Sequence, residues 1–195
     1  MRKLQALLPL LAAAIIFAPF LSTRATAQQP RPQQRAEEEA PALIALKGVD
    51  GKTYDLAKMR GDVVLVSFGA TWCQPCSEEL RALEELKKEY KNQPVKFLWI
   101  SIESPEEATD KDLRGFAKAN KLTFPVLRDP TKFTYAQFST RVRLPLVLLY
   151  DKNGTLTAKQ FGMSASPEKY KTFLRARFDK LLAAETGVAK TGSVK

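Results

Sequence analysis

The residues with the clearest capacity for chemistry are the two cysteines, Cys73 and Cys76, which Gln74 and Pro75 separate. They follow an apolar run at 63–68, a pattern typical of a buried strand that leads into a helix. At such a junction both sulfurs would lie on one face of the first helical turn. Unpaired N–H groups at a helix start carry partial positive charge, which favours a thiolate. The spacing therefore predicts a redox-active dithiol.

Other uses of two cysteines fit the sequence less well. A structural zinc site takes four ligands, usually Cys or His, and this chain has two Cys and no His. We therefore expect no metal and no cofactor. A structural disulfide is common in exported proteins, but a bridge that closes so short a loop contributes little through chain entropy. The alternative interpretation is a non-catalytic binding module with a local Cys73–Cys76 disulfide.

The N-terminal residues predict export. Arg2 and Lys3 precede an apolar stretch at 7–21, and a small-x-small cleavage pattern ends at Ala27. The apolar stretch is shorter than the roughly 20 residues of a spanning helix. We expect 1–27 to be a signal peptide that contacts the membrane only if it stays uncleaved. The protein would then act in the periplasm or at the outer face of the cytoplasmic membrane.

The remainder divides into three segments. Residues 28–41 are rich in Gln, Pro, Glu and Arg without apolar periodicity, which indicates a flexible linker. Residues 42–186 form one domain that is long enough to bury its own core. Residues 187–195 are predicted to be a disordered tail.

The basic surplus of the chain does not indicate nucleic-acid binding. The formal net charge is +10, from 31 Lys and Arg against 21 Asp and Glu. The basic residues alternate with glutamates along the expected helices, and no basic and aromatic patch of the RNA-binding kind is present. We interpret the surplus as a solvated basic surface that meets anionic membranes or acidic partner proteins.

Hydrophobic periodicity predicts strands that alternate with helices early in the chain and a hairpin late. Such an order favours an α/β fold with a mixed central sheet and helices on both faces. The expected strands are 43–46, 52–54, 63–68, 95–102, 124–127, 146–150 and 156–161. The expected helices are 73–90, 111–119 after a start signal at 104–107, 135–138, and a last helix opened by Ser166 and Pro167.

Together with Trp72, Pro75 and a proline before the late hairpin, Pro145, the dithiol motif resembles the thioredoxin superfamily. Within it, the chain is similar to the TlpA/ResA-like exported thiol-disulfide oxidoreductases over nearly all of 42–185. This resemblance implies a thioredoxin-like fold with a mixed central β-sheet flanked by helices, an N-terminal β-hairpin and an inserted helical segment. The implied activity is reduction of partner-protein disulfides, for example in cytochrome c maturation. The protein would act as a monomer and would receive its electrons from a membrane electron donor.

The resemblance also assigns catalytic roles to individual residues. Cys73 matches the nucleophile, Cys76 the resolving thiol, and Glu79 a functional glutamate near the thiols. A solvated surface glutamate is the alternative for Glu79, and its neighbour Glu78 could take the same part.

Partner binding is assigned to Trp72, Pro75, Leu144 and Pro145. Pro145 matches a proline that is cis in this fold, and the Leu144 backbone would pair with an extended partner by strand addition. Two residues depart from the pattern. Ser67 stands where cytosolic thioredoxins have a buried aspartate, and Gly69 stands where many relatives have an aromatic residue.

Overall fold

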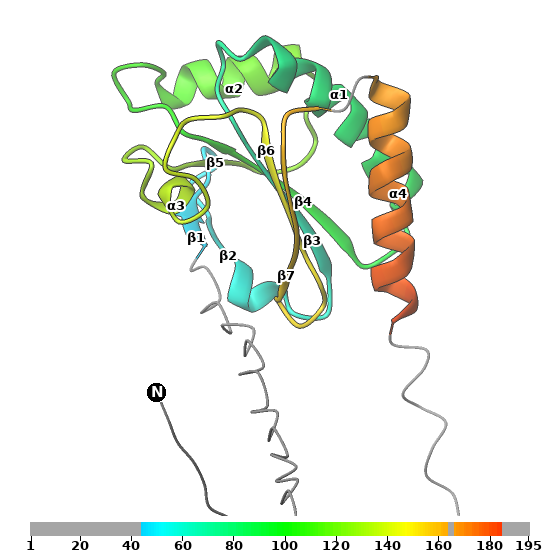
Figure 1. The fold of residues 1–195 in the computed structure, drawn as a ribbon. Helices are drawn as coiled ribbons and strands as arrows, with labels where there is room; N and C mark the ends of the chain where they lie inside the picture. Colours follow the sequence, from blue (N-terminus) through cyan, green and yellow to red (C-terminus); the bar gives the residue numbers. More distant parts are fainter. Residues whose placement is uncertain (1–43, 164–165, 185–195) are drawn as a thin grey trace, which may run out of the picture. The chain divides into compact units, whose positions relative to one another are not determined.

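Strands buried on both faces form the centre of the fold (Figure 1). The computed structural model of the chain describes residues 44–163 and 166–184. All seven residues of β3 (Val63–Gly69) are buried, and β3 pairs in parallel with β4 (Val95–Ser101). The other elements are β1 (Ala45–Lys47), β2 (Thr53–Asp55), η1 (Leu56–Met59), α1 (Gln74–Glu89), α2 (Asp110–Ala119), β5 (Val126–Arg128), α3 (Phe133–Ala136), β6 (Leu146–Tyr150), β7 (Leu156–Phe161) and α4 (Pro167–Ala183).

The central sheet is mixed, as the sequence predicts. Its strand order is β5-β4-β3-β6-β7, in which β3, β4 and β5 are parallel while β6 and β7 run antiparallel to their neighbours. The predicted N-terminal hairpin is present as β1 and β2, and it adjoins the β5 edge through a bridge between Gly48 and Leu127. β3 therefore lies in the middle of the sheet, and its C-terminal end is enclosed by neighbouring strands.

Two hydrophobic clusters cover the two faces of this sheet. On one face, α1, α2 and α4 contribute Leu80, Leu113 and Phe178 to a core that includes Leu65 and Trp99 of the strands. Fully burying a leucine or phenylalanine side chain contributes about 1.5–3 kcal/mol, so this face carries much of the stability.

The opposite face of the sheet is covered by the N-terminal hairpin, η1 and α3. Its core joins Phe68 of β3 to Tyr135 and Phe138, and it also includes both cysteines. The tyrosine ring meets that of Phe68 edge to face, with 5.5 Å between ring centroids. The redox pair is therefore packed into the hydrophobic core on the α3 face.

Capping residues set the helix starts. Ser166 caps α4 and Pro167 occupies its first turn, as predicted. The helix start predicted at 104–107 is wrong, because these residues form a single turn rather than a helix. Ser104 N–H donates to the Glu107 carboxylate at 2.8 Å, and Ala108 N–H returns to Ser104 O at 3.0 Å. Thr109 then forms a separate capping box that begins α2.

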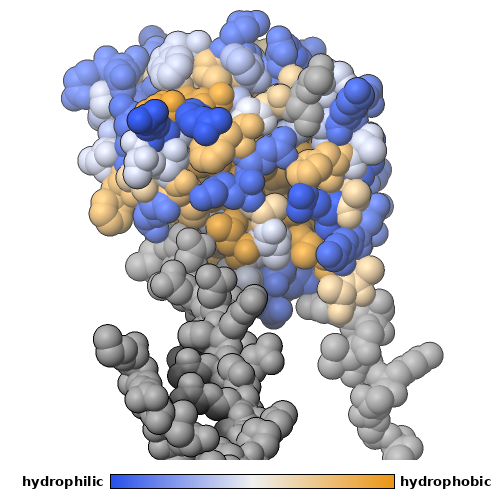
Figure 2. Space-filling model, in the orientation of Figure 1, coloured by the Kyte–Doolittle hydropathy of each residue, from blue (hydrophilic) through white to orange (hydrophobic). Residues whose placement is uncertain are grey.

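Several predicted segments lie outside the described residues. The signal peptide at 1–27, the linker at 28–41 and the tail at 187–195 belong to this group. Among the residues that are described, no helix has the length and apolar content needed to cross a membrane. Figure 2 shows hydrophobic residues interspersed with hydrophilic ones on the face in view.

The departure at Gly69 has a packing reason. A Cβ atom at this position would lie 2.5 Å from Nε1 of Trp99. The indole is fully buried and stacks on Phe116 with ring centroids 5.1 Å apart, so it has little freedom to move aside. Glycine is therefore required at the end of β3 because the indole occupies the space that a side chain would need.

We predict that Gly69→Ala lowers the free energy of unfolding by about 1–3 kcal/mol through overpacking. Gly115→Ala is the matched control, because a Cβ in the middle of α2 would meet no atom within 4 Å. That substitution should stabilise the protein by about 0.5–1 kcal/mol through helix propensity. Urea denaturation measures both values, and equal effects of the two substitutions would contradict the packing argument.

Candidate active site

The two cysteines form a disulfide at the junction of β3 and α1. Their Cα atoms are 5.3 Å apart, and the sulfurs are bonded at 2.10 Å. Cys73 is the N-cap of α1, and its Sγ accepts the N–H of Cys76 at 3.3 Å. Cys73 keeps 5% of its surface exposed whereas Cys76 keeps none. The predicted order of accessibility is thus correct, and the helix-start N–H is aimed at the outer sulfur.

A buried carboxylate holds the loop that leads to Cys73. Glu103, the second residue after β4, is 1% exposed. One of its oxygens accepts Thr71 N–H at 2.8 Å and Ser101 Oγ–H at 2.9 Å, and the other accepts Thr71 Oγ1–H at 2.6 Å. Cys73 N–H in turn donates to Ala70 O at 3.1 Å. The loop is therefore fixed to the end of the neighbouring strand.

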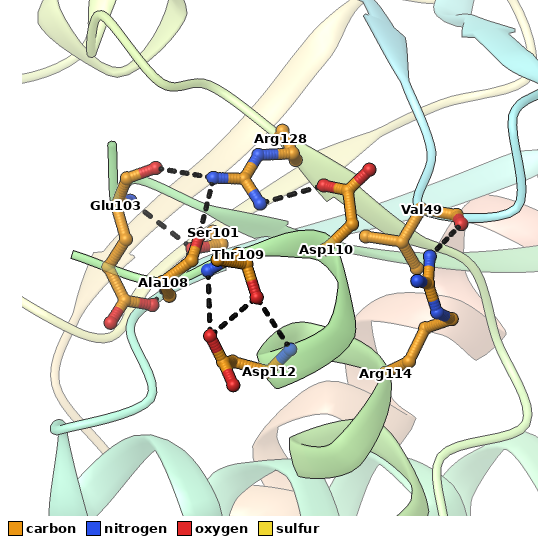
Figure 3. Close-up of polar contacts among 9 residues, drawn as sticks. All are labelled: Val49, Ser101, Glu103, Ala108, Thr109, Asp110, Asp112, Arg114 and Arg128. Carbon is orange, nitrogen blue, oxygen red and sulfur yellow. Dashed lines mark hydrogen bonds and ion pairs between the residues drawn. The ribbon is translucent and has the colours of Figure 1, made fainter. Parts of the chain in front are cut away.

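Arg128 fixes the segment that carries Glu103 (Figure 3). Its guanidinium donates to the carbonyl oxygens of Glu103 at 3.4 Å and Ala108 at 2.7 Å, and it pairs with Asp110 at 2.8 Å. Figure 3 shows these contacts converging from both ends of the loop between β4 and α2. A charge on β5 thereby stabilises the backbone on which Glu103 stands.

The peptide bond between Leu144 and Pro145, before β6, is cis. Leu146, the next residue, pairs with Phe68 in the register of β6 against β3, so the cis bond lies beside the end of β3. Leu144 packs against the hydrophobic cluster that contains both cysteines. The cis state that the resemblance implied is confirmed, and the bond lies beside the C-terminal end of β3, the strand that leads to the disulfide.

The loop before Pro145 is held by a buried tyrosine. The Tyr135 hydroxyl accepts the N–H of Arg143 at 2.8 Å, and it lies within donating distance of the carbonyl oxygens of Arg141 at 3.2 Å and Arg143 at 3.0 Å. Ser139 Oγ donates to the same Arg141 carbonyl at 2.6 Å. Main-chain positions 141 and 143 are therefore fixed from within the fold.

Glu79 lies one turn after Cys76 on α1 and is fully buried. Its two oxygens accept Ser67 Oγ–H at 2.7 Å and Tyr170 O–H at 2.6 Å. Burial raises the pKa of Glu79 to about 7, although the two hydrogen bonds act in the opposite direction. The surface-glutamate interpretation is wrong for Glu79 and right for Glu78, which is exposed.

This carboxyl also explains the departure at Ser67. A glutamate from α1 reaches the strand position where cytosolic thioredoxins carry a buried aspartate, and the serine hydroxyl donates to it. On the far side, burial and the adjacent Glu79 carboxylate raise the pKa of Tyr170, so its hydroxyl stays protonated and donates. The buried acid is thus supplied from a helix instead of from the strand.

The remaining predicted site residues lie around the disulfide. Pro75 is exposed in the first turn of α1, where a missing N–H costs no helical bond. Trp72 is 63% exposed, so its ring offers an apolar surface next to Cys73. Among the described residues, no three His, Cys, Asp or Glu side chains gather closely enough to hold a metal ion.

Sequence reasoning missed three residues of this site. Glu103 had a usable signal, since it is a charged residue directly after an apolar strand, at the same sheet edge as the cysteines. Tyr170 and Tyr135 had none, because an aromatic residue in an apolar helix pattern does not reveal where its hydroxyl finds a partner.

The raised pKa of Glu79 predicts a pH dependence of stability in the oxidised protein. Between 4.5, the ordinary value, and about 7 the folded state binds more protons than the unfolded state. Stability from this group is thus present below pH 4.5 and lost as pH rises through 7, by about 3 kcal/mol. Glu79→Gln should remove that loss, and Glu78→Gln should retain it. Denaturant titrations across this pH range measure the free energy of unfolding. The same pH dependence of that free energy in wild type and Glu79→Gln would contradict the prediction.

Comparison with known proteins agrees with this geometry. Residues 36–159 match the model of the AhpC/TSA family. The thioredoxin-like protein YneN of Bacillus subtilis is 32% identical over 131 residues, which cover 67% of this chain and 74% of that protein. The thiol-disulfide oxidoreductase ResA of Bacillus cereus is 30% identical over 125 residues, which cover 64% and 69%.

Solved structures show the same fold. A putative thiol:disulfide interchange protein DsbE of Chlorobium tepidum has a TM-score of 0.63 at 24% identity, and the match covers 73% of this chain and 94% of that one. The exposed lipoprotein thioredoxin of Streptococcus pneumoniae has a TM-score of 0.58 at 28% identity, with coverage of 72% and 100%. The chain therefore belongs to the AhpC/TSA family, as a ResA-like thiol-disulfide oxidoreductase of the thioredoxin superfamily.

Proposed function

We propose that this protein is exported and reduces disulfides in partner proteins, with Cys73 as nucleophile and Cys76 as resolving thiol. The observation that carries the proposal is the Cys73–Cys76 disulfide at the start of α1, after a strand whose C-terminal end pairs with the residue that follows the cis Leu144–Pro145 bond. The N–H of Cys76, which faces the Cys73 sulfur, would stabilise the attacking thiolate.

The exchange runs in two displacements. In the reduced protein, the Cys73 thiolate attacks one sulfur of the partner disulfide, that S–S bond breaks, and the other partner sulfur leaves as a thiolate. Cys76 then loses its proton, and its sulfur attacks the Cys73 sulfur and displaces the partner. Two electrons pass from the dithiol to the partner, whose two sulfurs end as thiols.

Glu79 is proposed as the group that takes the proton of Cys76. The carboxyl is one helical turn away on α1, and its pKa of about 7 lets it bind and release protons near neutral pH. Ser67 and Tyr170 hold it in place. Trp72, Pro75, Leu144 and Pro145 are proposed to contact the partner segment around its cysteine.

The setting of the reaction is proposed from the sequence. The basic start and apolar stretch of 1–27 support export to the periplasm or the outer face of the cytoplasmic membrane. We propose a monomer that is re-reduced by a membrane electron donor and that acts on clients such as apocytochromes c. A relative named as an exposed lipoprotein thioredoxin supports the location.

Substitution of each cysteine by serine should separate the role of the nucleophile from that of the resolving thiol. Cys76→Ser should accumulate mixed disulfides with partners because nothing resolves them, whereas Cys73→Ser should form almost none. Non-reducing electrophoresis followed by mass spectrometry of the adducts measures both. Adducts on Cys76 of the Cys73→Ser protein at a comparable rate would reverse the assignment. Absence of adducts from both would favour a non-catalytic binding module.

Glu79→Gln should change the titration of the thiols in the reduced protein. A nearby carboxylate disfavours the thiolate, so its removal should lower the apparent pKa of the cysteine pair and shift the pH-rate profile of exchange to lower pH. Glu78→Gln is the matched control, since this side chain is exposed one position away. Alkylation rates against pH measure the effect, and a shift in the control alone would transfer the role to Glu78.

A further inference from the structure

We propose that the loop before Pro145 selects partner segments that carry acidic side chains next to their cysteine. This inference rests on the proposed function, because it concerns which disulfides the site accepts. Two features of the loop carry it. They are the alternation of its free main-chain groups and the two guanidinium groups of Arg141 and Arg143.

The main-chain N–H and C=O groups of this loop are available for hydrogen bonds to a partner at every second residue. Positions 141 and 143 are satisfied by Tyr135 and Ser139. Within 44–163 and 166–184, the N–H and C=O groups of Val142 and Leu144 make no hydrogen bond. Because an antiparallel partner strand hydrogen-bonds to every second residue, this pattern fits one extended segment laid along the loop.

The side chains around that segment are apolar and cationic. Trp72 is 63% exposed and Val142 is 51% exposed, two of the three exposed large hydrophobic residues in the described chain. Both arginines are exposed, and neither forms an ion pair with any other described residue. Arg143 lies over the ring of Phe161 at 4.8 Å, which orients its guanidinium without neutralising it.

The acidic groups at this end of the sheet lie on other elements. Glu106 and Glu107 belong to the loop after β4, and Glu107 faces Lys132 at 4.0 Å. β4 and β6 flank β3 on opposite sides, so these acids and the Arg141–Arg143 loop follow and precede strands on opposite sides of β3. Glu78 is exposed in the first turn of α1. A segment on the loop before β6 would therefore meet two positive charges that no acidic residue of the described chain pairs with.

Two synthetic peptides test the preference. Each holds one cysteine as a mixed disulfide with 2-mercaptopyridine, flanked by aspartates in one peptide and by lysines in the other. Reduced protein would displace 2-mercaptopyridine through Cys73, and Cys76 would then release the peptide thiol, leaving the Cys73–Cys76 disulfide. Release of 2-mercaptopyridine gives the rate of the first step.

The wild-type protein should react about tenfold faster with the aspartate peptide at low ionic strength, as expected for electrostatic steering. The ratio should approach one at about 1 M salt, where the screening length is about 3 Å. In Arg141→Glu/Arg143→Glu the preference should reverse, and in Arg141→Ala/Arg143→Ala it should disappear. Circular dichroism and thermal unfolding check that each variant is folded.

Lys88→Glu/Lys91→Glu is the matched control, because it changes the net charge as much as Arg141→Glu/Arg143→Glu does, at and just beyond the C-terminal end of α1. It should retain the wild-type ratio. Equal rates for the two peptides, or an equal loss of preference in the control, would overturn the inference and leave the proposed function standing. No reaction of wild type with either peptide would overturn the proposed function as well.

Discussion

The burial of β3 on both faces is the constraint on which the site depends. Because β4 and β6 pair with it on either side and all its side chains are buried, its C-terminal end has one fixed position. The chain must leave that end through a short loop, and the Cys73 cap begins α1 there. The Thr71–Glu103 contact and the Leu146 register then bring the second strand end and the cis peptide to the same point. The order of the strands in the sheet therefore determines where the two sulfurs lie.

Buried carboxyl groups are the second feature that organises this end of the fold. Glu79 and Glu103 are both removed from water, and each is surrounded by hydroxyl or amide donors instead of by cations. A cation would lower the pKa of a buried carboxyl group, whereas the neutral donors around Glu79 only partly offset the effect of burial. This difference suits Glu79, whose pKa lies near neutrality. Glu103 serves geometry, since its oxygens bind two groups of one threonine.

Local sequence was enough to predict most of the fold and the cysteine pair. The apolar runs of β3 and β6 and the last five residues of β4 are buried on both faces, and Ser166 with Pro167 signals the start of α4, so each of these elements is determined by neighbouring residues. Local sequence does not predict the role of a side chain whose partner is distant in the chain. Glu79 meets Tyr170 across 91 positions, and Thr71 meets Glu103 across 32. Such partners depend on the final packing, and the signal at 104–107 failed because Thr109 caps the helix instead.

The pinning of the loop by Tyr135 separates what holds the backbone from what a partner touches. Main-chain atoms of residues 141 and 143 are fixed by the Tyr135 hydroxyl, so the position of this backbone does not depend on an ion pair of the two arginine side chains. A scaffold of this kind can exchange one recognition chemistry for another by changing two side chains without rebuilding the backbone. The hydrogen bonds to residues 141 and 143 restrict the loop backbone in the absence of a partner, and such preorganisation lowers the entropy lost on association. If the proposed recognition by Arg141 and Arg143 holds, substitutions at these two positions would change which partners are accepted while the redox centre stays the same.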